Sequence, residues 1–405
     1  MHPGRLSVAL LGAAWCGGAA GADMSVAGFS MRHDIVLQAR SEQSRYFEAF
    51  DGAGSRVDAL EARLNLNARC AQAWCEGASV VLRARLYGAR REALPGAIWD
   101  RPSSLAEAYV VHSAGEDLQI GAGKRYLGWG PALLYSPTNR LFPDNGAVSP
   151  RKEVPGKPML FASAALPGAG RASVLAANPR QQDLFGRDVG GVFVLARAEW
   201  QQQAQQLSSF GLVAGGGGAL APYAGLYAQR ALGDAFTLGG EVALSRRYAR
   251  DPSRAQVSYN AGARKFDLVL NLRYGMRSGA ELGLELVQNG YALDGVELAE
   301  PRLAALPSAG SRAGYNRAMH PLVQRRYALL QYTTPSLLGN KRWGVTARSL
   351  HGLDRFSRDQ FAELSYSATD AITVYAGHAR SRVAPELRMT RPVTRNVYLT
   401  VESFF

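Results

Sequence analysis

The chain has 405 residues, a formal net charge of +13 and 47% hydrophobic residues, which are spread thinly along the sequence. After the first residues, no stretch approaches the roughly 20 apolar residues that a transmembrane helix requires, so a helical membrane protein is excluded. Five of the 46 basic residues are Lys and the rest are Arg, but they form no single patch, so nucleic acid is not an expected partner.

Residues 1–22 have the pattern of a cleaved export signal. Arg5 is the only charge before an apolar run over residues 6–15, and small residues end the segment at Ala22. Signal peptidase accepts small side chains near the bond that it cleaves, so we expect cleavage after Ala22. The mature protein is then one domain over residues 23–405, with a net charge of +12 once Arg5 is removed.

Strict alternation of apolar and polar residues is the strongest pattern in the sequence. It is clear over residues 60–68, 82–86, 266–274 and 280–286. Successive strand residues face opposite sides, so each segment has one apolar face and one polar face. A soluble β-sandwich would show the same alternation. The number of segments and their length of about ten residues instead favour strands that cross a membrane.

Counting such segments predicts a transmembrane antiparallel up-and-down β-barrel of about eighteen strands, with sixteen as the alternative. The expected strands are 30–40, 57–69, 77–88, 104–113, 116–126, 158–166, 170–178, 190–200, 203–214, 219–230, 234–246, 264–275, 279–288, 325–334, 341–350, 359–367, 371–379 and 395–405. Connections after even-numbered strands are short, and those after odd-numbered strands are mostly long, with the glycine run 215–218 as the one short exception. This pattern predicts short periplasmic turns, long extracellular loops and periplasmic termini.

Cys70 and Cys75 remain after the signal peptide is removed with Cys16. An even pair of cysteines in an oxidising compartment favours a small disulfide loop, which the strand count places on the periplasmic side. The spacing fits neither a zinc site nor a CxxC redox pair, and no histidine is near, so the expected role is structural.

Several arginines fall on the polar faces of the predicted strands. A lipid-facing Arg near the bilayer midplane costs roughly 2–4 kcal/mol, so these side chains are expected to line the lumen. The lumen candidates for contact with an anion or an acidic glycan are Arg63, Arg83, Arg85, Arg197 and Arg273. The same face carries Glu61, Glu199, Glu241, Glu281 and Glu285, so the arginines could instead form ion pairs across the barrel wall. The sequence favours anion selectivity and structural ion pairing equally as the role of these arginines.

The segment 126–158 is too long for an ordinary connection, which predicts a functional loop. Trp129 and Tyr135 offer rings on which sugars could stack, and Asn139 and Arg140 could bond to hydroxyl groups. In the alternative interpretation, Trp129 and Tyr135 belong to the aromatic girdle of a membrane barrel.

The last strand has alternating apolar residues and ends in Phe405. This pattern is similar to the signal that the outer-membrane insertion machinery recognises. The remaining expected partners are outer-membrane lipid and lipopolysaccharide, in the cell outer membrane of a Gram-negative bacterium.

No catalytic, cofactor or metal motif stands out. The six histidines are scattered without the spacing of metal ligands, and no GxSxG nucleophile motif occurs. His112 and Ser113 are the best candidates for a barrel hydrolase. Adjacent strand residues point to opposite faces, however, so they are badly placed to share a proton. We therefore expect no enzyme and no cofactor.

One local motif resembles a known family. A Gly-x-Gly-Lys-Arg strand end is followed by Trp129, Gly130, Pro131, Ser136 and Asn139, in a pattern similar to the Wzi-type capsule-assembly outer-membrane proteins. A looser resemblance links the chain to alginate-export barrels. The resemblance implies an eighteen-stranded barrel for capsule or exopolysaccharide assembly, export or attachment that binds surface polysaccharide, with these five residues at a structural corner of the barrel mouth. The alternative function is a passive porin-like channel for anionic solutes.

Overall fold

The computed structural model describes residues 24–26, 29–46, 54–70, 72–92, 97–100, 104–142, 154–178, 191–202, 208–217, 220–246, 264–290, 292, 322, 324–384 and 393–405. The predicted signal peptide, residues 1–22, lies outside them. Within these ranges, no helix has the length and hydropathy needed to cross a membrane.

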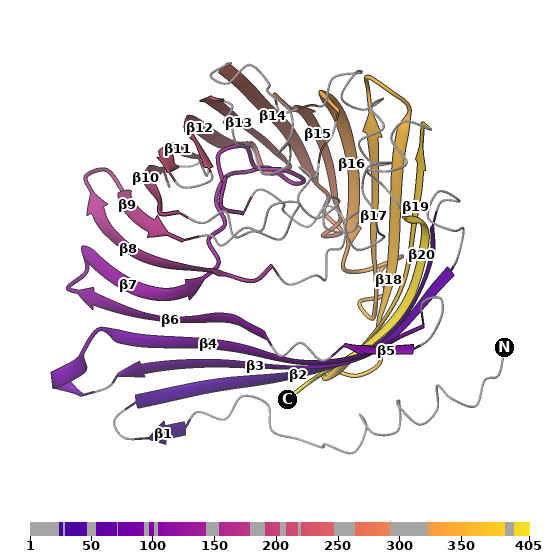
Figure 1. Ribbon diagram of the computed structural model, residues 1–405, viewed down its shortest axis with the longest axis horizontal. Coiled ribbons are helices and arrows are strands. Elements are labelled where there is room, and N and C mark those ends of the chain that lie inside the picture. Colours follow the sequence, from indigo (N-terminus) through magenta and orange to yellow (C-terminus); the bar gives the residue numbers. More distant parts are fainter. Residues whose placement is uncertain are drawn as a thin grey trace.

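Eighteen antiparallel strands of the described chain pair in sequence order, and the last pairs with the first, so the sheet closes into a barrel (Figure 1). The ring consists of β2 (Phe29–Tyr46), β3 (Gly54–Cys70), β4 (Ala78–Glu92), β6 (Ser104–Ala114), β7 (Leu118–Arg125), β8 (Lys157–Leu166), β9 (Gly170–Ala177), β10 (Phe193–Gln202), β11 (Ser208–Gly217), β12 (Leu220–Leu232), β13 (Phe236–Arg246), β14 (Arg264–Gly275), β15 (Glu281–Gln288), β16 (Arg326–Thr334), β17 (Trp343–Gly352), β18 (Ser357–Ser367), β19 (Ile372–Val383) and β20 (Val393–Phe404). Two short strands lie beside the ring, β1 (Met24–Val26) against β2 and β5 (Ala97–Asp100) against β4. The predicted eighteen-stranded barrel is confirmed, and the sixteen-stranded alternative is wrong.

Closure of the ring joins its first strand, β2, to its last, β20. The backbone N–H of Phe405 donates to the carbonyl oxygen of Ile35 at 2.9 Å, and the N–H of Ile35 donates back at 3.0 Å. The terminal Phe405 therefore belongs to the seam between β2 and β20. Its predicted recognition by the insertion machinery stays a prediction.

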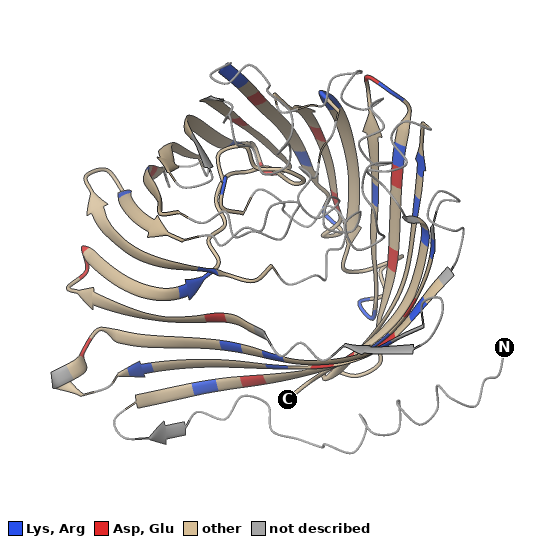
Figure 2. Cartoon of the chain, in the orientation of Figure 1, with Lys and Arg blue, Asp and Glu red and all other residues tan. Residues whose placement is uncertain are grey.

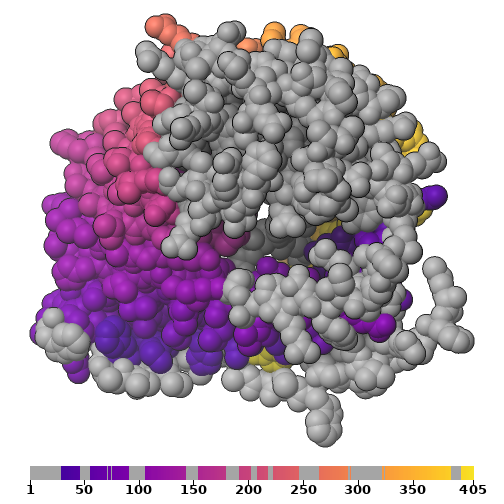
Figure 3. Space-filling view, in the orientation of Figure 1, coloured from indigo at the N-terminus to yellow at the C-terminus, as the bar shows by residue number. Residues whose placement is uncertain are grey.

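The alternation of the sequence sorts side chains between the two faces of the sheet. Leu60 and Leu160 on the outer face are 59% and 64% exposed, whereas Glu61, Glu241 and Glu285 on the inner face are buried. A water-soluble sandwich would bury such leucines, so the exposed apolar belt is the lipid-facing surface that the sequence predicted. In Figure 3 the indigo-to-magenta part of the chain forms a continuous stretch of the outer surface.

The connections differ in length at the two ends of the barrel. At one end, three-residue turns such as 115–117, 167–169 and 233–235 join the strands; at the other end, 31 residues separate β7 from β8. The predicted division into a short-turn end and a long-loop end is therefore present. The glycine run is not the one short connection at the long-loop end, because residues 353–356 also join β17 to β18 tightly.

The short-turn end carries a disulfide between β3 and β4 and a set of aromatic pairs on the outer face of the barrel. Cys70 and Cys75 form a disulfide, and a 3-10 turn, Ala73–Cys75, lies within its loop. Cross-strand aromatic pairs pack together on the outer face near this end: Trp200 with Phe210, Phe236 with Tyr274, and Trp343 with Tyr366, at ring centroid distances of 4.9, 4.8 and 4.5 Å. Aromatic residues in such positions form the girdle at a membrane–water interface.

Candidate functional site

The connection between β7 and β8 enters the barrel. Residues 126–142 of this connection, called the inner loop below, run inside the ring toward β10–β15 (Figure 1). Leu134, Tyr135, Asn139 and Leu141 in the inner loop are almost fully buried. Two apolar clusters on the inner face of the wall include inner-loop residues. The inner loop therefore covers one side of the lumen wall.

Glu241, on the inner face of β13, is the main anchor of the inner loop. Its Oε1 accepts a hydrogen bond from the backbone N–H of Ala132 at 3.0 Å. Its Oε2 accepts from the hydroxyl groups of Ser136 and Thr138, both at 2.7 Å. A buried carboxylate needs several donors to offset its desolvation, and the inner loop provides them.

Glu285 on β15 is a second anchor of the inner loop, and its hydrogen-bond donors are backbone groups rather than hydroxyl groups. Its two carboxylate oxygens accept from the backbone N–H groups of Leu133 and Leu134, the latter at 3.0 Å. On β14, the side chains of Asn271 and Arg273 both donate to the carbonyl oxygen of Pro131, at 2.9 and 2.7 Å. The wall thus satisfies the backbone donors of Leu133 and Leu134 and the backbone acceptor of Pro131.

Arg140 fixes the far part of the inner loop. Its guanidinium forms an ion pair with the buried carboxylate of Asp267 on β14 at 2.6 Å. Tyr223 on β12 donates its hydroxyl hydrogen to the carbonyl oxygen of Thr138 at 3.0 Å. Arg140 was predicted to meet a ligand, but the structure places it in this structural ion pair.

Glycines on the inner face make room for the inner loop. A Cβ atom on Gly239 would approach Pro131 Cβ to 2.7 Å, and one on Gly283 would approach Leu133 Cδ1 to 2.9 Å. Within the inner loop, Gly130 has φ +83°, and a Cβ there would meet Glu241 Oε1 at 2.2 Å. Only glycine allows this backbone conformation so close to the carboxylate.

The aromatic and amide side chains of the predicted motif hold the inner loop together. Asn139 donates from Nδ2 to the carbonyl oxygen of Leu127 at 2.8 Å and accepts from the N–H of Phe142 at 3.1 Å. Trp129 is buried beneath the guanidinium of Arg197, which lies 5.3 Å from its ring. Trp129 and Tyr135 are therefore inside the lumen, and their assignment to the lipid-facing girdle is wrong. Buried Tyr135 and Asn139 present no surface to a ligand.

The wall of β3 and β4 carries three of the predicted lumen arginines. Glu61 lies between Arg63 and Arg85 and pairs with both at 2.5 Å, and Glu107 pairs with Arg83 at 2.8 Å. The side chains of Arg83 and Arg85 are 46% and 30% exposed, whereas those of Glu107 and Glu61 are 7% and 5% exposed. The carboxylates thus lie behind the guanidinium groups, which face the lumen.

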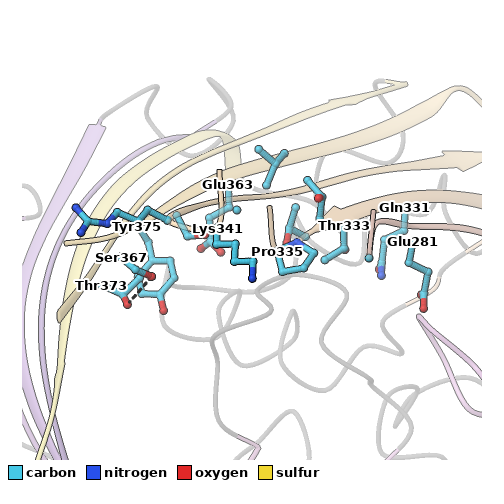
Figure 4. A pocket seen from close by; sticks show the side chains of 16 residues that line it. Glu281, Gln331, Thr333, Pro335, Lys341, Glu363, Ser367, Thr373 and Tyr375 are labelled. Carbon is cyan, nitrogen blue, oxygen red and sulfur yellow. Dashed lines mark hydrogen bonds between the residues drawn. The ribbon is translucent and has the colours of Figure 1, made fainter. Parts of the chain in front are cut away.

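A polar cavity of about 630 Å³ lies near the short-turn end, lined by residues of β15 to β19 and the turn after β16 (Figure 4). Hydroxyl and amide groups of Gln331, Thr333 and Thr373 line it together with the charged side chains of Lys341 and Glu363. These residues gave no motif in the sequence, because single Thr and Ser residues at inward strand positions look like any other polar face. Across the described ranges, no group of three or more His, Cys, Asp or Glu residues is placed to hold a metal ion.

Sequence reasoning missed the role of the acidic anchors. Glu241 and Glu285 were expected on the lumen face, which is correct, but as partners of arginines. The available signal was an acidic residue at an inward position on each of three neighbouring strands: Glu241 on β13, Asp267 on β14 and Glu285 on β15. These residues follow the proline-containing inner loop by about 100 residues or more, so the sequence alone did not connect them to it.

No protein-family model and no curated protein matches the chain. Similar solved structures include OccK11 (OpdR) of Pseudomonas aeruginosa, with a TM-score of 0.57 at 13% identity over 93% of this chain and 96% of that chain. OccAB4 of Acinetobacter baumannii gives a TM-score of 0.58 at 9% identity, over 93% of this chain and 98% of that one. The outer membrane protein opdK of Pseudomonas aeruginosa gives 0.54 at 15% identity, over 93% and 98%.

These similarities correct the resemblance to capsule-assembly proteins. The similar structures named here are Occ proteins rather than Wzi-type or alginate-export barrels, so that resemblance and the polysaccharide function derived from it are wrong. The motif covers a small part of the chain, and its residues dock the inner loop. The expectation that the protein is not an enzyme agrees with the shared fold and stays a prediction. The fold is that of an integral outer-membrane β-barrel, which confirms the predicted localisation.

Proposed function

We propose that the protein is a porin-like channel that passes small anionic solutes across the outer membrane. Barrels of 16–18 strands enclose an aqueous channel in porins, because a ring of that size is too wide for wall side chains to fill. The inner loop occupies one side of this lumen and reduces its width. Among the described residues, the hydrogen bonds that anchor it run to β12–β15 rather than to the wall of β2–β4.

The observation that carries the proposal is the arrangement of charges on that wall. Arg83 and Arg85 extend toward the lumen, and their carboxylate partners Glu107 and Glu61 lie buried behind them. A solute beside this wall meets cationic groups first, and fixed cations lining a pore favour anions. Guanidinium groups also bind carboxylates and phosphates through paired hydrogen bonds.

Planar-bilayer conductance tests the proposal. In a potassium chloride gradient, the wild-type protein should give stable open-channel currents with a reversal potential of the sign that chloride permeation produces. The variant Arg83→Leu should shift that potential toward zero, because an exposed cation of the wall is lost. Arg230→Leu is a suitable control, since Arg230 lies opposite the lipid-facing Leu238 and outside the lumen.

A folded protein that gives no current would contradict the channel itself. Currents without anion preference, or an equal effect of both variants, would contradict the role of the arginine wall.

A further inference from the structure

We propose that the outer surface of the barrel binds the phosphate groups of an outer-leaflet glycolipid through five arginines near the long-loop end. This arginine cluster consists of Arg45 on β2, Arg358 on β18, Arg380 and Arg382 on β19, and Arg395 on β20. The inference concerns the lipid-facing surface and is independent of the proposed channel function.

All five side chains are exposed on the outer face. Leu364 and Val397 are exposed apolar residues of the lipid-facing surface. Arg358 is six residues from Leu364, and Arg395 is two residues from Val397. Residues separated by an even number along a strand share a face. Arg380 and Arg382 lie directly opposite Arg395 and Arg358, which places them on the same outer face.

The register brings these arginines together across four strands. Arg380 on β19 is directly opposite Arg395 on β20, which is directly opposite Arg45 on β2. Arg358 on β18 and Arg382 on β19 form a second opposed pair. In Figure 2, Lys and Arg positions recur on these neighbouring strands at the right of the barrel.

The described part of the chain provides no counter-charge for the cluster. None of its five guanidinium groups forms an ion pair with a described carboxylate. The nearest acidic side chain on the outer face of β3, Asp58, is bonded to Ser41 at 2.7 Å and to Arg56 at 3.1 Å. Like charges directly opposite one another on a sheet are destabilising. An external anion would relieve this repulsion.

The cluster lies at the depth of lipid headgroups. On β18, Arg358 is eight residues from Tyr366, which belongs to the aromatic girdle at the short-turn end. At ~3.3 Å per residue and a tilt of ~35–45°, the two levels are roughly 20 Å apart along the membrane normal, close to the ~25 Å apolar band of such barrels. The long loops mark this end as the extracellular one, so the cluster faces the outer leaflet.

The chemistry of the cluster matches phosphate groups carried on a fixed scaffold. Arginine forms bidentate hydrogen bonds with phosphate, and several arginines in one row can bind two phosphate groups of one headgroup at once. Lipid phosphates of the outer leaflet are carried on glycolipid headgroups at this level. We therefore assign the cluster to a phosphorylated glycolipid rather than to free phosphate.

The experiment measures how much a lipid stabilises the delipidated protein in detergent. Unfolding is followed by the heat-dependent change in electrophoretic mobility while bisphosphorylated lipid A is titrated. The wild-type protein should be stabilised, and dephosphorylated lipid A and inorganic phosphate should have little effect. In Arg380→Gln/Arg382→Gln/Arg395→Gln, the apparent affinity for lipid A should fall roughly a hundredfold, since three near-surface charges are lost.

Two controls keep the result interpretable. Without lipid, the triple variant should unfold at or above the wild-type temperature, because opposed like charges are removed. Arg230→Gln removes one exposed arginine at the other end of the barrel and should leave the lipid A response unchanged. A wild-type response in the triple variant would overturn the proposal. An equal response to dephosphorylated lipid A or to phosphatidylglycerol would overturn the assignment to a phosphorylated glycolipid.

Discussion

Glu241 and Glu285 stabilise the inner loop through different kinds of donor, and this difference decides how each site responds to substitution. Glu285 accepts only from backbone N–H groups, which cannot become acceptors. Glu241 accepts chiefly from two hydroxyl groups, of Ser136 and Thr138, which can reverse and accept instead. The sequence predicted that both carboxylates face the lumen. It did not predict their partners, since these depend on the conformation of a loop more than 100 residues away.

Glu285→Gln should release the inner loop far more than Glu241→Gln. In the first variant an amide NH2 group faces a backbone N–H, so one buried hydrogen bond to a charged group is lost, at a cost of about 2–3 kcal/mol. In the second, the new NH2 group donates to the hydroxyl oxygens. Limited trypsin cleavage after Arg140, mapped by mass spectrometry, reports loop opening and should accelerate roughly 30- to 150-fold in Glu285→Gln.

The matched variant Glu241→Gln should accelerate the cleavage only slightly. Equal cleavage rates in the two variants would contradict the assigned donor chemistry. A wild-type rate in both would show that the two carboxylates do not hold the inner loop.

At the scale of strands, all eighteen members of the ring were predicted, because alternation persists wherever one face meets lipid and the other meets water. The predicted ends were too early on some strands. β2 continues to Tyr46 rather than residue 40, and β19 continues to Val383 rather than residue 379. Beyond these points the outward residues are polar, including Gln43, Arg45 and Arg380, so the apolar half of the pattern is lost while the hydrogen-bonded ladder continues.

Neighbouring positions on β4 test the assignment of faces. Arg83 contacts Glu107 in the lumen, whereas Ala84 pairs with the lipid-facing Leu64 of β3 and Leu105 of β6. Arg83→Leu should still fold, because the carboxylate of Glu107 keeps its hydrogen bond from the backbone N–H of Tyr126. Ala84→Arg should be destabilised by about 2–4 kcal/mol, because it places a charge in the hydrocarbon layer.

Urea-induced unfolding in lipid vesicles measures the difference between the two β4 variants. Ala84→Leu is the control for added side-chain volume and should fold as well as the wild type. If Arg83→Leu and Ala84→Arg were equally stable, the face assignment of β4 would be wrong.

For the whole molecule, local sequence similarity and global fold carry different information. The motif from Trp129 to Asn139 suggested a capsule-assembly protein, yet its residues serve to pack a loop against a wall. Such packing depends on backbone geometry at Gly130, on the carbonyl acceptor of Pro131 and on the hydroxyl donor of Ser136, which barrels of different function could share. The number of strands and the closure of the barrel, by contrast, follow from an alternation of apolar and polar residues that extends over the entire chain, and both were predicted correctly.

The barrel and the inner loop should be separable, because ladder hydrogen bonds alone close the ring. The two ends of the inner loop are adjacent: the rings of Tyr126 and Phe142 are 4.7 Å apart, and Asn139 bonds to Leu127. A short Gly-Ser linker replacing residues 128–141 would therefore join Leu127 to Phe142 without strain.

Removal of the inner loop exposes Glu241, Asp267 and Glu285 to lumen water, which solvates their carboxylates. The variant should therefore keep the heat-dependent electrophoretic mobility of a folded barrel. Its single-channel conductance should rise, since the lumen widens. A variant that folds with unchanged conductance would show that the loop does not narrow the pore, and one that fails to fold would show that the barrel depends on it.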